Sequence, residues 1–225
     1  MSPMLFVPAF TLVEAWMRSC AAEDAAVLQS TYDDVLDVFK ALLEGIPVDE
    51  DWYAAEYPAV ADAIARRAIE SASAHFQRHG HFEGRQPFAD GWRDLVRPVP
   101  FIETQAKLRV VPAKGRLQVR VERDVFIGLI KNVIKAVPVD EEWYRAAYPA
   151  VSNMIGNGLV PSAAHHYVEM GYFESKMPFD FVVDEGWYFS QYEHVRNGIA
   201  RGAARSAKDH FFRIGYGEGC RPVPR

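Results

Sequence analysis

A thirteen-residue segment occurs twice in this chain and returns a third time in a diverged form. VDEDWYAAEYPAV begins at Val48, VDEEWYRAAYPAV begins 91 positions later, and VDEGWYFSQYEHV begins a further 44 positions on. The similarity continues, at constant spacing and without insertion, into SASAHFQRHGHFEGRQPF, SAAHHYVEMGYFESKMPF and SAKDHFFRIGYGEGCRPV. Repetition over this length predicts that one supersecondary unit is used three times.

Each copy has the pattern of three short helices. Asp49 stands at an N-cap position and is followed by acidic residues, which favour a first helical turn. Pro58 is replaced by Glu193 in the third copy, and both residue types suit a first turn, so a second helix should begin there. Ser71 should cap a last helix, and Gly80 should end that helix as a left-handed C′ residue. The equivalents in the other copies are Asp140 and Asp184, Pro149, Ser162 and Ser206, and Gly171 and Gly215.

A longer amphipathic helix precedes the first two copies. Residues 33–50 and 124–141 share an apolar pattern at the same 91-residue offset. Such a stripe is typical of a helix that packs against a core. The stripe consists of Val35, Leu36, Phe39, Leu42 and Leu43, matched by Phe126, Ile127, Ile130, Val133 and Ile134.

The segment 105–123 has the pattern of a β-hairpin. Apolar and polar residues alternate on both sides of the sequence PAKG, which predicts two strands joined by a turn. One face is apolar and the other is basic, and the basic face is either a solvated strand surface or a docking surface for an anionic partner. That partner could be an acidic glycan, a phosphorylated ligand or an acidic protein, and the strand edges could also pair with a second copy of the chain. The basic residues are Lys107, Arg109, Lys114, Arg116 and Arg120.

These features predict a mainly α protein of three related short-helix repeat units with one inserted β-hairpin. The expected divisions are an N-terminal arm and helix (1–31), repeat 1 (32–88), a linker with the basic hairpin (89–123), repeat 2 (124–179) and a truncated repeat 3 (180–225). The arm lacks the basic start of a signal peptide and the long apolar run of a membrane span. We expect it to lead into a helix that packs on its own domain or docks to a partner, through Phe10, Val13, Trp16, Met17 and Cys20.

Composition narrows the classes of function. The net charge of −5 over 225 residues argues against a nucleic-acid binder. Only Cys20 and Cys220 are present, which indicates a reducing compartment and a cytoplasmic location. The sequence contains no GxxxxGK[ST], HExxH, GxSxG or CxxC pattern. We therefore expect neither an enzyme nor a bound cofactor.

A histidine and a glutamate recur in every copy. One histidine per unit favours a structural role, such as a ring bonded to a neighbouring backbone group or to the glutamate of its own unit, over a shared metal site. Recurring Trp–Tyr pairs at helical spacing are typical of a core, with stacking on sugar rings as the alternative. The residues concerned are His75, His166 and His210; Glu83, Glu174 and Glu218; Trp52 and Tyr53, Trp143 and Tyr144, and Trp187 and Tyr188.

The recurring pattern WYxxxYPxV…SAxxH[FY]xxxGxxEGRxP resembles a short repeat of bacterial proteins concerned with cell-surface glycans, often attached to glycosyltransferase domains. The first copy carries the match in Trp52-Tyr53, Tyr57-Pro58, His75-Phe76, Gly80 and Glu83-Gly84-Arg85; the second carries it in Trp143-Tyr144, Tyr148-Pro149, His166-Tyr167, Gly171 and Glu174. The chain departs from the pattern at Ala59 and Ala150, where aspartate is expected, at Ser175-Lys176 and at Glu193-His194. The resemblance implies a non-catalytic accessory module.

Together, the repeats and the resemblance predict a non-catalytic scaffold or adaptor, accessory to bacterial surface-polysaccharide biosynthesis. A glycan-binding module that uses the Trp–Tyr pairs and an oligomeric assembly protein are the alternatives. The expected partner is a protein or a second copy of the chain, with an anionic ligand at the hairpin.

Overall fold

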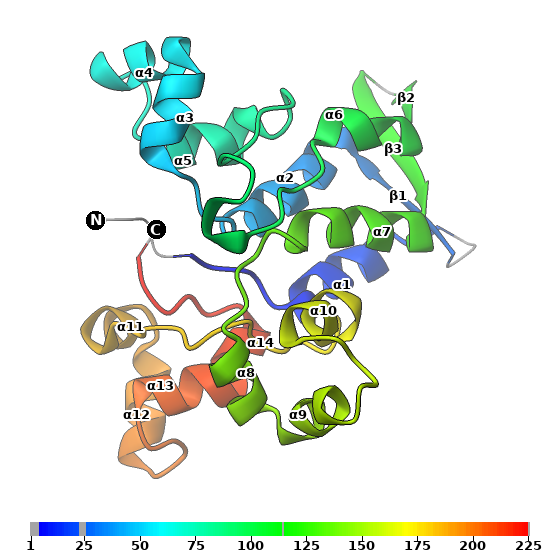
Figure 1. Cartoon of the computed structure of the whole chain (residues 1–225). Coiled ribbons are helices and arrows are strands. Elements are labelled where there is room, and N and C mark those ends of the chain that lie inside the picture. Colours follow the sequence, from blue (N-terminus) through cyan, green and yellow to red (C-terminus); the bar gives the residue numbers. More distant parts are fainter. Residues whose placement is uncertain (1–4, 23–25, 114, 225) are drawn as a thin grey trace. The chain divides into compact units, whose positions relative to one another are not determined.

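The computed structural model of the chain describes residues 5–22, 26–113 and 115–224 (Figure 1). These residues are mainly helical and include one small three-stranded antiparallel sheet, which confirms the predicted fold class. The chain divides into two compact units, Met1–Val7 with Met17–Pro138 and Pro8–Trp16 with Val139–Arg225. The boundaries of the sequence repeats and of the compact units therefore differ, because the helix that opens repeat 2 belongs to the first compact unit.

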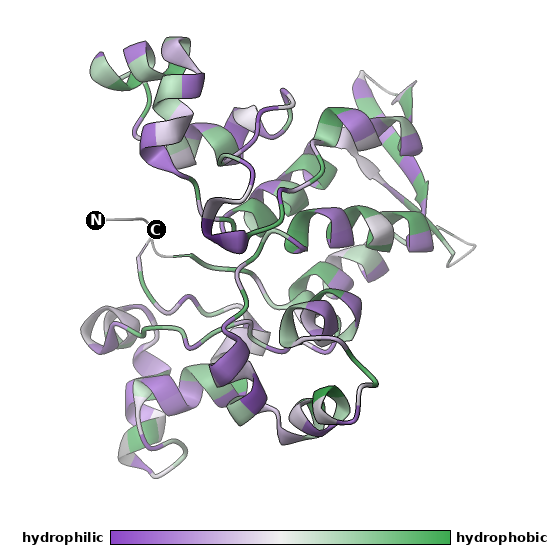
Figure 2. Ribbon diagram, viewed as in Figure 1, coloured by the Kyte–Doolittle hydropathy of each residue, from purple (hydrophilic) through white to green (hydrophobic). Residues whose placement is uncertain are grey.

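Two matching helices form the centre of the first compact unit. Helix α2 (Tyr32–Leu43) and helix α7 (Arg123–Ile134) pack against each other, and the rings of Phe39 and Phe126 meet edge to face with centroids 5.8 Å apart. In Figure 2, hydrophobic and hydrophilic residues alternate along both helices, as an amphipathic pattern requires. Most of the apolar stripe predicted from the sequence is buried: Val35, Phe39, Leu42, Leu43, Phe126, Ile130, Val133 and Ile134.

The sheet has one strand more than the sequence predicts. Strands β2 (Arg109–Ala113) and β3 (Arg116–Glu122) form the expected hairpin, but β1 (Val27–Thr31) pairs antiparallel with the other side of β3. Strand β3 is therefore central, and α2 and α7 both pack against it. The predicted hairpin is confirmed, but one of its two edges is paired with β1 of the same chain.

The 40 residues from Asp49 to Phe88 form a structural unit that we call module 1; Asp140–Phe179 is module 2 and Asp184–Val223 is module 3. Module 1 lies in the first compact unit and modules 2 and 3 lie in the second. Each module consists of two short helices, a third four-residue helix and a five-residue π-helical turn. The bounds are α3 (Glu50–Glu56), α4 (Pro58–Ala65), α5 (Ala72–His75) and η1 (Phe76–Gly80); α8 (Glu141–Ala147), α9 (Pro149–Gly156), α10 (Ala163–His166) and η4 (Tyr167–Gly171); and α11 (Glu185–Gln191), α12 (Glu193–Ala200), α13 (Ala207–His210) and η5 (Phe211–Gly215).

The remaining short elements lie outside the repeated helices or follow them. They are η2 (Trp92–Asp94), α6 (Phe101–Thr104) and η3 (Gln105–Lys107) in the linker, and α14 (Tyr216–Glu218) at the end of module 3.

The predicted helix starts are confirmed in all three modules. The carboxylate of Asp49 accepts a hydrogen bond from the Trp52 N–H at 3.1 Å, and the equivalent aspartates do the same. The hydroxyl of Ser71 caps the third helix by accepting from the Ala74 N–H, and its equivalents accept in the same way. A second helix begins at Pro58, at Pro149 and at Glu193.

A backbone hydrogen bond joins the two ends of each module. The N–H of Asp49 donates to the carbonyl of Pro87, and the equivalent pairs are Asp140 with Pro178 and Asp184 with Pro222, all at 3.0 Å. Each module is thus closed by a bond between its first and its next-to-last residue.

The predicted role of Gly80, Gly171 and Gly215 is wrong. These glycines end the π-helical turns with ordinary helical φ, and the left-handed residues are those four positions later: Gly84, Ser175 and Gly219. The three glycines are needed for close approach instead. A Cβ on Gly171 would overlap the Tyr144 hydroxyl and lie 3.1 Å from His166 Nδ1, and the other two glycines meet the equivalent groups.

The predicted N-terminal helix is present as α1 (Phe10–Ser19). Phe10, Val13 and Met17 are buried, and Trp16 and Cys20 are half-buried. In the second compact unit, the Phe10 ring packs edge to face on Tyr172 and Phe173, with centroids 5.7 and 5.0 Å apart. This end of the helix therefore packs on its own chain.

Candidate functional site

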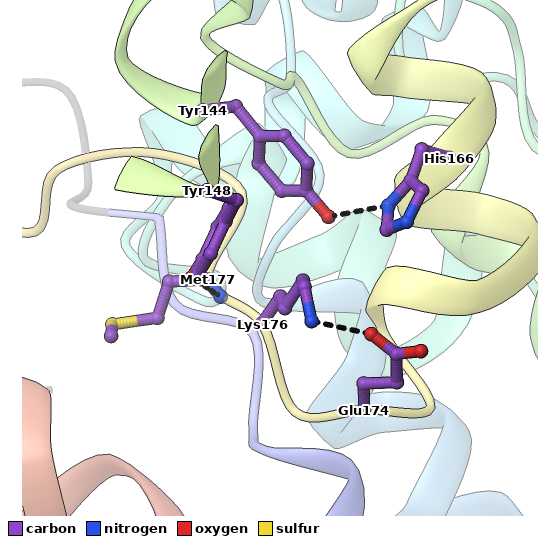
Figure 3. Close-up of polar contacts among 6 residues, drawn as sticks. All are labelled: Tyr144, Tyr148, His166, Glu174, Lys176 and Met177. Atoms are coloured by element: carbon purple, nitrogen blue, oxygen red, sulfur yellow. Dashed lines mark hydrogen bonds and ion pairs between the residues drawn. The ribbon is translucent and has the colours of Figure 1, made fainter. Parts of the chain in front are cut away.

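A tyrosine–histidine pair recurs in every module, buried in modules 1 and 2 and partly buried in module 3. In module 2, the hydroxyl of Tyr144 on α8 and Nδ1 of His166 on α10 share a hydrogen bond of 3.0 Å (Figure 3). The corresponding pairs, Tyr53 with His75 and Tyr188 with His210, have the same 3.0 Å separation. The histidines therefore bond to tyrosine, and the predicted partners, a backbone group or the glutamate of the unit, are wrong.

A second tyrosine closes the turn that ends each module. The Met177 N–H donates to the Tyr148 hydroxyl at 2.9 Å, while the Lys176 ammonium pairs with Glu174 and lies 5.3 Å from the centre of the Tyr148 ring (Figure 3). Module 1 repeats this arrangement with Tyr57, Arg85 and Glu83. In module 3 the tyrosine is Tyr192, and Cys220 stands where the other modules carry a cation.

A glutamate at the start of each module joins the first helix to the third, a contact that the sequence pattern alone does not predict. The Glu50 carboxylate accepts from the N–H groups of Ala72 at 2.7 Å and Ser73 at 3.0 Å, which are otherwise unpaired donors at the start of α5. Glu141 and Glu185 reach Ala163 and Ala207 in the same way. The sequence signal for this contact was the constant 22-residue separation in all three copies.

Burial keeps the tyrosine–histidine pairs neutral. Desolvation lowers the pKa of His166, and the nearby Glu174 carboxylate opposes that shift only in part. Desolvation also raises the pKa of Tyr144 well above its usual value. The same directions hold for Tyr53 with His75 and for Tyr188 with His210. Two neutral groups that satisfy each other inside a module hold the third helix on the first.

The glycan-stacking prediction does not hold for the tyrosines. Tyr53, Tyr144 and Tyr188 are 0% exposed, so a sugar ring cannot reach their faces. The neighbouring tryptophans are half-buried, and each lies edge to face with the next tyrosine of its own helix pair; Trp52 also contacts Arg97, and Trp143 also contacts Phe212. The centroid distances are 6.1 Å for Trp52 and Tyr57, 6.0 Å for Trp143 and Tyr148, and 6.2 Å for Trp187 and Tyr192.

Substituting Tyr144 by phenylalanine should lower the free energy of unfolding by about 1–3 kcal/mol, because it leaves the buried His166 ring nitrogen without its partner. Tyr172→Phe is the matched control, since Tyr172 is equally buried and its hydroxyl bonds to no described residue. We expect the control to be neutral or stabilising. Urea denaturation followed by circular dichroism measures both, and equal losses would contradict a role for the pair.

The basic residues of the sheet separate into two groups. Lys107, Arg109 and Arg120 line one open depression of about 370 Å³ in the first compact unit. Arg116 lies apart from them, near the carboxylate of Asp34 at the start of α2, whose pKa is lowered first by the hydroxyl of Thr31 and, more weakly, by this arginine. Lys114 lies outside the described residues. The structure therefore brings three of the five predicted basic residues together.

Apolar side chains form the rest of the depression. Val27 at the start of β1, Val121 on β3 and Val125 on α7 line it together with the carboxylate of Glu122. The three cations are all exposed. This is a surface that can bind an anion.

Across residues 5–22, 26–113 and 115–224, no cluster of three or more His, Cys, Asp or Glu side chains could hold a metal ion. None of the helices in these ranges is long and apolar enough to cross a bilayer. No known protein family, curated protein or solved structure matches this chain.

Proposed function

We propose that the chain is a non-catalytic helical-repeat scaffold or adaptor. The observation that carries this proposal is that the recurring polar residues form hydrogen bonds inside the modules. The capping aspartate, the bridging glutamate and the tyrosine–histidine pair each bond within their own module. Residues that recur in order to hold a frame together are typical of repeat proteins, in which function lies on the side chains that vary.

The exposed positions of the modules do vary. His79, Met170 and Ile214 occupy equivalent exposed positions, and Leu159, which is 73% exposed, is matched by Ala68 and Ala203. The three modules therefore share one backbone structure and present three different surfaces. This suits an adaptor that contacts more than one site on its partners.

We place the partner surface at the basic residues of the sheet, where Lys107, Arg109 and Arg120 gather. An acidic partner would be attracted there despite the net charge of −5. The resemblance to repeats of glycan-associated bacterial proteins supports a place in surface-polysaccharide biosynthesis. The free thiols of Cys20 and Cys220 support a cytoplasmic location.

Reversing the charge at Arg109 and Arg120 should remove an acidic protein partner without unfolding the chain. Exposed charges contribute little to stability, so we expect the melting temperature of the double variant R109E/R120E to stay within about 2 °C of the wild type. A purified partner first captured by the wild-type chain should bind the variant at least about tenfold more weakly, with a smaller difference at high salt.

The matched control is Arg116→Glu, because Arg116 lies on the same strand but outside the depression. A partner that binds the wild type and both variants equally would contradict the sheet as a docking surface. Light scattering on the same samples tests self-association: a dimer that becomes a monomer in R109E/R120E would make the second copy the partner.

Glycan binding is the second candidate, and the half-buried Trp52, Trp143 and Trp187 are the observation that favours it. Their fluorescence should change on saturation with a surface oligosaccharide if they stack on sugars. An unchanged spectrum, with a protein partner still bound, would leave only the scaffold.

A further inference from the structure

Two arginines of the sheet face each other directly across neighbouring strands. Arg109 on β2 is the register partner of Arg120 on β3, so the two side chains leave the same face of the sheet side by side. Like charges at directly opposed positions destabilise a sheet. No described carboxylate forms an ion pair with either guanidinium.

A third cation adds to this pair. Lys107 lines the same depression, and Glu122 is the one acidic side chain among its described lining residues. Among these described lining residues, three positive side chains and one carboxylate leave a net charge of +2. The isolated protein therefore bears a repulsion that a bound anion would relieve.

We propose that this depression binds a phosphate monoester in its doubly charged form. The charge of the ligand, about −2 at neutral pH, matches the excess of two positive charges. Guanidinium groups bind phosphate oxygens through paired N–H donors, and two arginines with one lysine can serve all three free oxygens. The volume of about 370 Å³ suits a small group, and the valines can contact the carbon that carries the phosphate.

A long polyanion fits this surface less well. Nucleic acids gain affinity from many successive phosphate contacts, whereas three cations line this depression among the residues that the structure describes. The proposal rests on the same docking surface as the proposed function, and it names the group that this surface recognises.

The test is a titration of the ¹⁵N-labelled full chain with inorganic phosphate at pH 7.5 and constant ionic strength, followed by NMR. We expect saturable shifts confined to residues 107–110, 119–125 and 27. The charge-neutral variant R109Q/R120Q should bind at least about tenfold more weakly, since each charge-assisted hydrogen bond is worth a factor of this order. Arg116→Gln, on the same strand but beside Asp34, should bind as the wild type does.

Two further ligands identify the source of the phosphate. A phosphoserine peptide and a hexose 1-phosphate carry the same phosphate group on a protein and on a sugar. The ligand that binds with the higher affinity identifies the class of partner. Methyl sulfate, which is similar in size but carries one charge, should bind at least about tenfold more weakly than phosphate.

Shifts that do not saturate, equal binding of methyl sulfate, or equal weakening in R116Q would overturn the proposal. Circular dichroism melting confirms that each variant is folded. These outcomes are independent of the protein-partner experiment, because a scaffold can lose its phosphate site and still bind a protein through other contacts.

Discussion

Replacing Gly171 by alanine should destabilise the protein by about 3 kcal/mol or more. The added methyl group would overlap the Tyr144 hydroxyl, and that hydroxyl is held by His166 in a fully buried position. The chain must either displace the tyrosine or break its hydrogen bond, and overpacking and an unsatisfied buried group each cost about 1–3 kcal/mol. Chemical denaturation followed by circular dichroism measures the change.

Gly128→Ala is the matched control. Gly128 lies inside α7, and a Cβ there would meet nothing within 4 Å. The same substitution should stabilise this helix by about 0.5–1 kcal/mol. In addition, the double variant G171A/Y144F should lose less stability than the sum of the two single variants, because the second substitution removes the oxygen that the first one meets. A strictly additive pair would contradict the proposed clash.

Lowering the pH should destabilise the protein through His81. This side chain is 1% exposed, packs edge to face with Phe76 and Phe82, and has an Nδ1 that bonds to no described residue. Burial lowers its pKa from 6.5 to about 4. The unfolded chain therefore binds a proton at His81 before the folded chain does, and stability is lost as the pH falls from about 6.5 to about 4. We expect a loss of about 2–3 kcal/mol between pH 7 and pH 4.5 from this residue alone.

The other modules supply the control for His81. Tyr172 and Tyr216 occupy the equivalent position, so His81→Tyr introduces a residue that the frame already accommodates twice. The variant should keep about 2–3 kcal/mol more of its pH 7 stability at pH 4.5 than the wild type keeps. Denaturation at both pH values measures this difference, and parallel losses in the two proteins would show that His81 does not cause the acid sensitivity.

Local sequence signals predicted most of the fold. The capping residues Asp49 and Ser71, the helix start at Pro58 and the hairpin all depend on neighbours close in the chain. The three copies made these signals stronger, because Glu193 in place of proline identified a helix start rather than a kink.

The features that the sequence did not reveal depend on distant residues. The sequence pattern around Gly80 is that of a helix terminator. A glycine is needed there, however, because the hydroxyl of Tyr53, 27 positions earlier, occupies the space that a side chain would fill. The five residues of β1 are too short to show a strand pattern, and they form a strand because β3 offers an edge. The grouping of Lys107 with Arg109 and Arg120, apart from Arg116, likewise follows from the strand register and from the position of Asp34.

The hydrogen bond between the two ends of each module bears on how such a chain can change in length. Because the first N–H of a module bonds to a carbonyl near its own end, a whole module can be removed or added without breaking the backbone bond that closes it. The 91-residue and 44-residue offsets correspond to copies with and without the preceding long helix. Duplication of a 91-residue or a 44-residue stretch of the gene could therefore extend this array. Each new copy would carry all the residues that form the hydrogen bonds inside a module, and its exposed side chains would be free to diverge.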